Sequence, residues 1–384
     1  MCVKGMILML KMVAITPFGV ESIARREMTA LGFDVESVSD GRIYFNTDST
    51  GVARANVNLR TVERIYHILD AREVRSFDEL FDWIAALSYR KIVDPEGAFI
   101  VNAQSKKSTL YSLRDIQKIT KKALIEAFKK DFGRAVFNEQ GEAFDFLVHI
   151  DNDRAELLID TSGEALHKRG YRKQTGPAPI KETLAAALVM MSFYEKDRIL
   201  IDPFCGSGTI PIEAAMIAKN IAPGLNRDFA FTAIPLFGRA ALKQAKRDAF
   251  KAIDQSIDPQ IEASDIDRSY VEIAKENAFE AGVDDAIRFH TSDFRYLLWD
   301  KPHSVVITNP PYGKRLGNDS ALDSLYKDLG HVIRSNPTNS FYVMTPYVGF
   351  EKQVAKKADR TRVLFNGRIK TRLYQYFGPP PQKK

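Results

Sequence analysis

One short segment combines residue types that could act on an amino group. Asn309-Pro310-Pro311-Tyr312 follows the apolar stretch 305–308. The two prolines stiffen the turn and leave carbonyl groups without competing local donors. The side-chain carbonyl of Asn309 and a backbone carbonyl can both accept hydrogen bonds from one amino group, and Tyr312 offers a flat face on which a base can stack. The segment predicts a catalytic turn made of these four residues; the alternative is an ordinary proline-rich turn.

The chemistry that suits this turn is methylation of a nucleobase amine. Such an amine is a poor nucleophile because its lone pair is delocalised into the ring. Two acceptors favour the pyramidal nitrogen and stabilise the positive charge that develops as it attacks a methyl group. The reaction needs neither a strong base nor a metal ion, so we expect no metal site. Guanine N2 and adenine N6 are both ring amines, and the turn does not distinguish them.

A glycine-rich segment, 202–209 (DPFCGSGT), follows a predicted strand at 199–201 and precedes a predicted helix at 210–217. Gly206 and Gly208 allow the backbone to approach a ligand closely, and the helix N-terminus presents unpaired N–H groups. The spacing is not Gly-x-Gly-x-x-Gly, and the Lys-Ser/Thr of a P-loop is absent, which disfavours nicotinamide cofactors and ATP. The alternative is a tight turn of a doubly wound fold.

Two acids follow the next predicted strands. Asp265 ends a strand at 260–265, where an acid can accept hydrogen bonds from both hydroxyls of a ribose. Asp293 follows a strand at 286–290 and could accept a bond from an adenine amino group, with Ile266 and Phe294 on the two faces of the ring. Asp267 is expected to cap the following helix. The alternative is that these acids are only caps and turn residues.

The predicted elements place these segments at one edge of a sheet. From residue 166 onward strand and helix patterns alternate, which is typical of an α/β domain with helices on both faces of a parallel sheet. Further strands are expected at 304–308 and 340–345, and a hairpin at 362–377. Residues 1–70 read β-α-β-β-α, which suggests a ferredoxin-like sheet. Residues 71–165 contain a helix, a strand at 98–103, a basic helix at 112–128 and a hairpin at 144–160.

Composition sets broad limits on the class of protein. The 384 residues carry a formal net charge of +6, which fits a polyanionic partner without proving one. The two cysteines, Cys2 and Cys205, form no Cys-x-x-Cys pair, which argues against a zinc ribbon and fits a reducing compartment. No stretch is long and apolar enough to span a bilayer, and the apolar N-terminus is interrupted by lysines. We therefore expect a cytoplasmic protein without membrane association.

Together the motifs resemble those of class I S-adenosylmethionine-dependent methyltransferases, in the amino-methylating group that carries Asn-Pro-Pro-Tyr. The resemblance implies S-adenosylmethionine as cofactor and a Rossmann-like sheet of seven strands, whose last strand, near 371–377, is antiparallel. The residues matched to cofactor binding are Lys181, Asp202, Phe204, Gly206, Ser207, Gly208, Asp265, Ile266, Asp293 and Phe294.

The stretches 166–172 and 178–186 resemble the start of the catalytic domain in THUMP-containing RNA guanine-N2 methyltransferases, most of all the RlmL type, which acts on large-subunit rRNA. This resemblance implies a ferredoxin-like domain at 1–70, a THUMP RNA-binding domain at 71–165 and a methyltransferase domain at 166–384. The expected reaction is N2-methylation of a guanine in 23S rRNA, free or in a pre-50S particle. The alternatives are a THUMP-type tRNA methyltransferase, an adenine-N6 DNA methyltransferase and a non-catalytic RNA-binding factor. The last would have lost its cofactor loop or catalytic turn, and both are present.

Basic residues crowd the second segment, and Lys118, Lys121 and Lys122 fall on one face of its basic helix. In a THUMP-like domain this face is expected to contact RNA phosphates, and Lys168, Arg169 and Arg172 are expected to extend the track. The alternative is a solvated helix surface. The long connection 222–259, with its phenylalanines, could shape the base pocket or serve a purely structural role.

Overall fold

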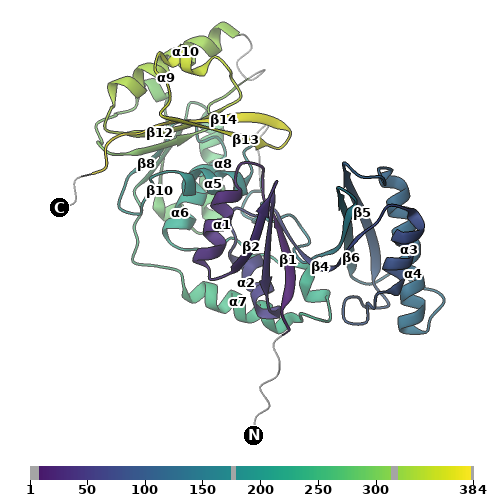
Figure 1. The fold of residues 1–384 in the computed structure, drawn as a ribbon. Helices are drawn as coiled ribbons and strands as arrows, with labels where there is room; N and C mark the ends of the chain where they lie inside the picture. The colour runs from purple at the N-terminus through teal and green to yellow at the C-terminus, as the bar shows by residue number, and fades with distance from the viewer. Residues whose placement is uncertain (1–7, 174–178, 313–318, 382–384) are drawn as a thin grey trace. The chain divides into compact units, whose positions relative to one another are not determined.

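The computed structural model describes residues 8–173, 179–312 and 319–381, so the predictions that involve Cys2, Ala178 and Gly313 lie outside the described residues. The chain divides into two compact units (Figure 1). The first unit comprises the chain up to Ile15, Glu27–Leu166 and Arg227–Asp248; the second comprises Thr16–Arg26, His167–Asn226 and Ala249–Lys384. Within the described residues no helix is long and apolar enough to cross a membrane.

The first unit is built on one seven-stranded sheet with the strand order β2-β3-β1-β4-β7-β6-β5. Only β5 and β6 pair in parallel, and the other neighbours are antiparallel. The strands are β1 (Leu10–Ile15), β2 (Asp34–Ser39), β3 (Arg42–Thr47), β4 (Arg64–Glu73), β5 (Ala98–Lys106), β6 (Ala143–Asp151) and β7 (Arg154–Asp160). Strands β1, β2 and β3 follow the predicted β-α-β-β order, and β5, β6 and β7 lie close to the predicted strand at 98–103 and hairpin at 144–160.

Strand β4 joins the two halves of this sheet and is missing from the sequence prediction. Its first residues pair with β1 through Ile15↔Arg64, and its length from Tyr66 to Glu73 pairs with β7. The boundary expected between residues 70 and 71 therefore falls inside a strand. The sheet of the ferredoxin-like segment continues into the sheet of the following segment without a linker.

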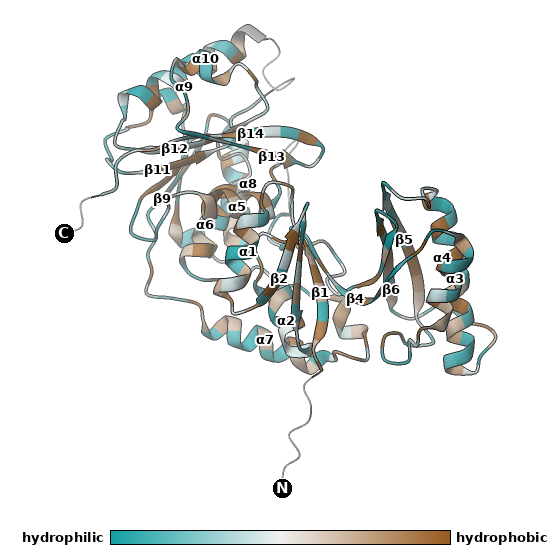
Figure 2. Ribbon diagram, in the orientation of Figure 1, coloured by the Kyte–Doolittle hydropathy of each residue, from teal (hydrophilic) through white to brown (hydrophobic). Residues whose placement is uncertain are grey.

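Two helices, α3 (Phe77–Ala86) and α4 (Leu113–Phe132), lie together beside β5 and β6 (Figure 1). Helix α3 begins at a capping box in which Ser76 and Glu79 satisfy each other's backbone N–H groups. Helix α4 ends at Gly133, which takes a left-handed φ of 66°. In Figure 2 both helices alternate between brown and teal, as expected for helices with one buried face.

The segment Arg227–Asp248 belongs to the first unit, although the chain reaches it from the second. Phe231 is fully buried, its N–H donates to Thr161 O over 2.9 Å, and its ring meets Phe237 edge-on. Phe237 in turn contacts His67. Of the two roles considered for this connection, the structure supports the structural one.

The second unit contains the other seven-stranded sheet, with the order β10-β9-β8-β11-β12-β14-β13. The first five strands are parallel, and β14 is antiparallel to both of its neighbours. This confirms the expected seven-stranded sheet with an antiparallel final strand. The strands are β8 (Leu200–Asp202), β9 (Ile261–Asp265), β10 (Ile287–Thr291), β11 (Val305–Thr308), β12 (Ser340–Thr345), β13 (Arg360–Asn366) and β14 (Ile369–Tyr376).

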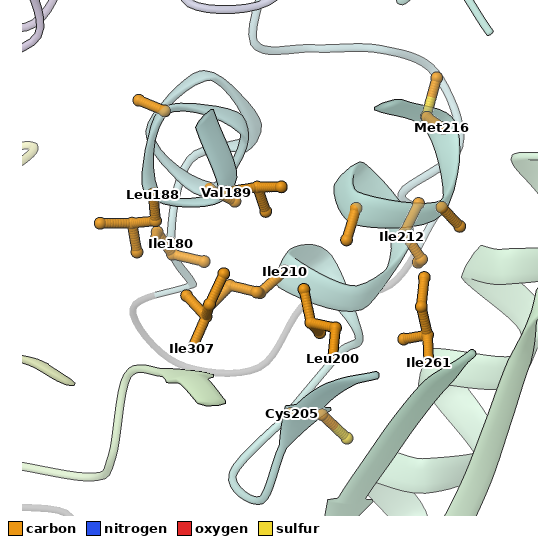
Figure 3. Packing of buried hydrophobic residues seen from close by; sticks show 14 of the residues in the cluster. Ile180, Leu188, Val189, Leu200, Cys205, Ile210, Ile212, Met216, Ile261 and Ile307 are labelled. Atoms are coloured by element: carbon orange, nitrogen blue, oxygen red, sulfur yellow. The ribbon is translucent and has the colours of Figure 1, made fainter. Parts of the chain in front are cut away.

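Helices cover both faces of this sheet (Figure 1). One face packs against α5 (Glu182–Met191), α6 (Thr209–Ala218) and α8 (Arg268–Glu280), and Figure 3 shows side chains of the sheet meeting those of α5 and α6. The other face packs against α9 (Asp319–Ser335) and α10 (Phe350–Val354). The remaining helices are α1 (Glu21–Ala30), α2 (Ser49–Asn58) and α7 (Arg239–Lys251). Strands β11 and β12 are buried throughout, which explains their apolar sequences.

Candidate active site

A cavity of about 710 Å³ opens at the carboxyl ends of the parallel strands of the second unit. This edge is where α/β sheets bind ligands, and the volume lies in the range of small-molecule sites. The sequence-predicted residues that line it are Asp202, Phe204, Gly206, Ser207, Asp265, Ile266, Asp293, Phe294, Asn309 and Pro311. Lys181, Gly208, Pro310 and Tyr312 are not among the lining residues. The sheet thus brings together segments that lie more than a hundred residues apart in the chain.

Glycine is needed at two positions of the loop after β8 for different structural reasons. Gly206 lines the cavity with a φ of 52°, and a Cβ placed on it would meet nothing within 4 Å. Gly208 precedes α6 with a φ of 83°, and a Cβ there would lie 3.0 Å from the Cβ of Ala274 on α8. Gly206 therefore keeps space open at the cavity wall, whereas Gly208 allows α6 and α8 to pack closely.

Asp202 ends β8 and is buried at the back of the cavity. One of its oxygens accepts hydrogen bonds from Thr308 Oγ1 at 2.8 Å and from the Phe204 N–H at 3.2 Å. Burial raises the pKa of this carboxyl to about 7, and the nearby charge of Asp265 acts in the same direction. The side chain ties the glycine loop to the end of β11, directly before the predicted catalytic turn.

Asp265 ends β9 and ties that strand to the glycine loop. Its two oxygens accept from the N–H groups of Gly206 and Asp267, each at 3.0 Å. Burial raises the pKa of Asp265 even though these hydrogen bonds favour its charged form. The predicted cap is also present, because Asp267 accepts from the N–H of Ser269 at 2.8 Å. Asp265 faces the cavity at the position where the sequence places a ribose-binding acid.

Asp293 is held by a residue that the sequence prediction overlooked. Arg295 donates to both of its carboxylate oxygens, from Nε at 3.0 and 3.1 Å, and these bonds lower the pKa of Asp293. Phe294 is buried beside Phe204, with ring centroids 4.8 Å apart, whereas the side chain of Ile266 is 68% exposed. The cavity wall thus offers a paired carboxylate, an aromatic edge and an exposed aliphatic side chain.

Asn309 carries the most informative polar atom of the site. Its Oδ1 is buried and has no hydrogen-bond partner among the described residues, and the side chain lines the cavity. A buried acceptor without a donor costs about 1–3 kcal/mol, and such atoms in native proteins call for an explanation. A ligand amino group in the cavity would supply the missing donor. The adjacent turn is fixed from the other side, because the Tyr326 hydroxyl donates to Pro311 O at 3.4 Å.

Several lining residues were not among the residues predicted to bind the cofactor or the base. They are Pro179, Ile180, Pro203, Cys205, Thr209, Ile210, Asp267, Tyr270, Ser292, Arg295, Ala321, Ser324 and Leu325. Most of them lie within or beside a predicted motif, so the motifs themselves were a usable signal. Ala321, Ser324 and Leu325 come from α9, whose sequence carries no mark of a binding site.

The prediction that Arg169 and Arg172 contact RNA is wrong, because both side chains form ion pairs within the second unit. The Arg169 side chain is 2% exposed and lies 3.4 Å from the carboxylate of Glu213, which is fully buried. Arg172 pairs with Glu182 and donates to Ile180 O and Thr209 Oγ1 at 2.8 and 2.7 Å. Neither guanidinium is placed to neutralise a phosphate. Instead, Arg172 holds two residues of the cavity wall.

The predicted lysines are placed differently. Lys118 and Lys122 are exposed on α4, opposite its buried face, and Lys168 is also exposed. Lys121 lies on the same side of α4 but is half-buried and pairs with Glu139 at 3.2 Å. Lys118 and Lys122 therefore present their charges to the solvent, as a phosphate-binding surface requires.

Three family models match the chain in succession. A model described as the RlmL ferredoxin-like domain matches residues 11–66, a model of the THUMP domain matches residues 74–160, and a model described as an RMKL-like methyltransferase domain matches residues 169–375. The cavity lies within the last of these matches. Asn309 and Asp265 therefore belong to a segment that is similar to known methyltransferase domains.

Similarity to individual proteins extends over almost the whole chain. "Putative RNA methyltransferase YpsC" of Bacillus subtilis (strain 168) is 41% identical over 376 residues, 97% of each chain. The crystal structure of "a predicted N6-adenine-specific DNA methylase from Listeria monocytogenes str. 4b F2365" is 41% identical, with a TM-score of 0.91 over 97% of each chain. That of "SMU.472, a putative methyltransferase complexed with SAH" is 37% identical, with a TM-score of 0.91 over 98% of this chain and 100% of that one.

Proposed function

The chain belongs to the RMKL-like methyltransferases that also carry an RlmL ferredoxin-like domain and a THUMP domain, and on this premise we propose that it methylates the exocyclic N2 amino group of a guanine in 23S rRNA. The coarser activity is that of an S-adenosylmethionine-dependent RNA methyltransferase. The observation that carries the proposal is the buried Oδ1 of Asn309, which has no hydrogen-bond partner among the described residues and belongs to a residue that lines the cavity. A hydrogen-bond donor from the substrate would satisfy this buried acceptor.

The residues around the cavity fit S-adenosylmethionine, which supplies an electrophilic methyl group when bound. Asp265 would accept from the ribose hydroxyls, and Asp293 with Phe294 and Ile266 would contact the adenine. Gly206 and the N-terminus of α6 leave room for the methionine portion, toward which Lys181 at the start of α5 would reach. The similar protein SMU.472 was crystallised with SAH, the demethylated product of this cofactor.

In this reaction the residues of the chain would orient the guanine amine and stabilise the positive charge that develops on its nitrogen. Asn309 Oδ1 and a backbone carbonyl of the turn 309–312 would accept the two N–H groups of the guanine amine and hold its lone pair toward the methyl donor. Tyr312 would stack on the base, which must leave its helix or loop to enter the cavity. Developing positive charge on the nitrogen strengthens both hydrogen bonds. No residue has to act as a strong base, because the nitrogen that carries the new methyl group is acidic and releases its surplus proton to water.

We assign the three regions 1–70, 71–165 and 166–384 to a ferredoxin-like domain, an RNA-binding THUMP domain and the catalytic domain. Lys118 and Lys122, with Lys121 beside them, would neutralise phosphates of the RNA, and Lys168 would add to this charge. The partner is 23S rRNA, free or in a pre-50S particle. The boundary between residues 70 and 71 separates two assigned functions and not two folded units, since strand β4 runs through it.

A second candidate is methylation of adenine N6 in DNA, because the Listeria protein similar to this chain is described in those terms and the same turn would serve either amine. The THUMP match favours RNA over DNA, since that domain binds RNA in the family. Transfer RNA is a third acceptor that the same residues would accommodate.

The test incubates the protein with methyl-labelled S-adenosylmethionine and separated 23S rRNA, 16S rRNA, tRNA and DNA from a strain that lacks the gene. Nucleoside analysis then identifies the labelled base. We expect N2-methylguanosine in 23S rRNA. Label in tRNA guanine would replace the rRNA assignment, and label only in DNA adenine would refute the proposal. The Asn309→Ala variant is the control for contaminating activity.

A further inference from the structure

We propose that Tyr326 is a positioning residue that sets the geometry of the catalytic turn 309–312 through a directed chain of hydrogen bonds. The inference rests on the proposed function only in that the turn is catalytic. Tyr326 lies on α9, is fully buried and does not line the cavity. It would act through the turn and never touch the substrate.

The hydroxyl of Tyr326 joins two loops at the carboxyl edge of the sheet. It lies 2.7 Å from Thr345 Oγ1 at the end of β12, and it donates to Pro311 O in the turn after β11 at 3.4 Å. Thr345 Oγ1 also accepts the backbone N–H of Tyr347 at 3.2 Å. Tyr326 thus links the end of β12, through Thr345, to one carbonyl of the predicted catalytic turn.

The direction of this chain follows from counting hydrogens. Each hydroxyl has one hydrogen to donate. The one arrangement within this set in which both hydroxyls donate runs from the Tyr347 N–H to Thr345, from Thr345 to Tyr326, and from Tyr326 to Pro311 O. Hydrogen bonds in such a series polarise one another and strengthen. The carbonyl of Pro311 therefore accepts from a donor whose direction is set by this series.

The ring of Tyr326 is buried and packed between two aromatic neighbours. Tyr347 stacks on it at 5.0 Å with an interplanar angle of 28°, and Phe350 meets it edge-on at 5.2 Å. Burial raises the pKa of Tyr326 well above its usual value, so the hydroxyl keeps its proton and remains a donor at physiological pH. The turn therefore contacts a buried, packed hydroxyl that stays protonated.

The turn has few backbone donors with which to hold its own position. Pro310 and Pro311 have no N–H to anchor the segment by hydrogen bonds. A displacement of the two acceptors by about 1 Å is enough to lower a reaction rate by about a hundredfold. The Tyr326 hydroxyl would fix the turn at the distance from the bound methyl donor that the transfer requires.

The experiment compares Tyr326→Phe with Tyr376→Phe. The control also removes one buried tyrosine hydroxyl from the α9 side of the sheet, where Tyr376 donates to Lys356 O at 3.2 Å, away from the turn. On the nucleic acid that the wild type labels, we expect Tyr326→Phe to lower kcat about tenfold to a hundredfold. We expect the KM for S-adenosylmethionine and the Kd for S-adenosylhomocysteine to stay at wild-type values. Tyr376→Phe should leave kcat unchanged.

Thr345 gives a second pair of variants. Thr345→Val removes the donor to Tyr326 and should lower kcat, whereas Thr345→Ser keeps the hydroxyl and should restore it. Equal kcat values for Tyr326→Phe and Tyr376→Phe would overturn the proposal. So would a loss confined to cofactor affinity. If the wild type labels no nucleic acid, the proposed function fails. Crystal structures of wild type and Tyr326→Phe then decide, and an unmoved turn 309–312 would overturn the role of Tyr326.

Discussion

Thr308 Oγ1 donates a hydrogen bond to Asp202 Oδ1 over 2.8 Å, so the end of β11 holds the carboxyl group at the end of β8. Both residues are buried, and each directly precedes a loop that lines the cavity. The contact fixes the spacing between the glycine loop, which would hold the cofactor, and the turn that begins at Asn309. A charged group in this place is costly, because burial opposes its ionisation.

This cost predicts a pH dependence of stability. Burial raises the pKa of Asp202 from its ordinary value of 3.8 to about 7. A raised pKa means that the folded state binds the proton more tightly than the unfolded state, so this contribution to stability is present below about pH 4 and is lost as the pH rises to about 7. Without cofactor, we expect the free energy of unfolding of the wild type to fall over this range relative to Asp202→Asn, which cannot ionise. Parallel denaturation profiles of the two proteins between pH 4 and 8 would contradict it.

The role of Asn309 predicts a separation of catalysis from cofactor binding. Asn309→Ala removes an acceptor that would act on the amine, and removal of one such hydrogen bond typically lowers kcat by about 10²–10³-fold. The Kd for S-adenosylhomocysteine should stay close to the wild-type value. Asn309→Asp keeps an oxygen acceptor at the same place and should retain more activity than the alanine variant. Near-normal turnover by Asn309→Ala would remove this residue from the catalytic machinery.

The buried Arg169–Glu213 pair predicts an effect on stability where the sequence suggested an effect on RNA binding. Glu213 also accepts from the Tyr171 hydroxyl at 3.1 Å. Glu213→Ala would remove a buried carboxylate that pairs with Arg169, and breaking a buried ion pair by removing one partner typically costs about 3–5 kcal/mol. We expect a lower midpoint in urea denaturation, and partial recovery in the double variant Arg169→Met/Glu213→Leu. Unchanged stability together with a loss of RNA affinity would restore the earlier assignment of Arg169.

Local pattern was sufficient for most elements of the fold, because strands such as Ser340–Thr345 are buried along their whole length. Strand β4 was not predicted because its sequence, RIYHILDARE, mixes charged and apolar residues, and only two of its ten residues, Ile65 and His67, are buried. Its extended form depends on pairing with β1 and β7, which lie far away in the chain. Nothing in the local pattern encodes that pairing.

The candidate site could likewise be predicted only in part. Asp202, Asp265 and Asn309 could be predicted because each ends or follows an apolar strand, and the ends of parallel strands meet at one edge of a sheet. The residues that α9 contributes to the cavity could not be predicted, because the position of that helix over the edge of the sheet is set by core packing. The burial of Arg169 depends on a glutamate 44 residues away, and composition treats every arginine as a possible phosphate ligand.

The basic face of α4 predicts an effect on RNA binding without an effect on folding. Lys118 and Lys122 are exposed, so replacing both with alanine should change stability by no more than about 0.5 kcal/mol each. Each lost phosphate contact should reduce the slope of log K against log salt by about 1. The Lys275→Ala variant, which removes one charge from α8, is the control. If all three lysines affected the affinity equally, net charge rather than this surface would explain the binding.

Alanine is expected to impair a different property at each of the two glycines of the loop after β8. Gly206→Ala adds a methyl group at the cavity wall, where it meets no protein atom within 4 Å, so it should cost stability only through its left-handed backbone and should raise the KM for S-adenosylmethionine. Gly208→Ala places its Cβ 3.0 Å from Ala274 Cβ and should destabilise the protein by more than the cost of the left-handed backbone alone, about 1 kcal/mol. Thermal unfolding and cofactor titration of both variants measure the two effects. The assignment of Gly206 to cofactor space would be wrong if its variant bound S-adenosylhomocysteine as tightly as the wild type.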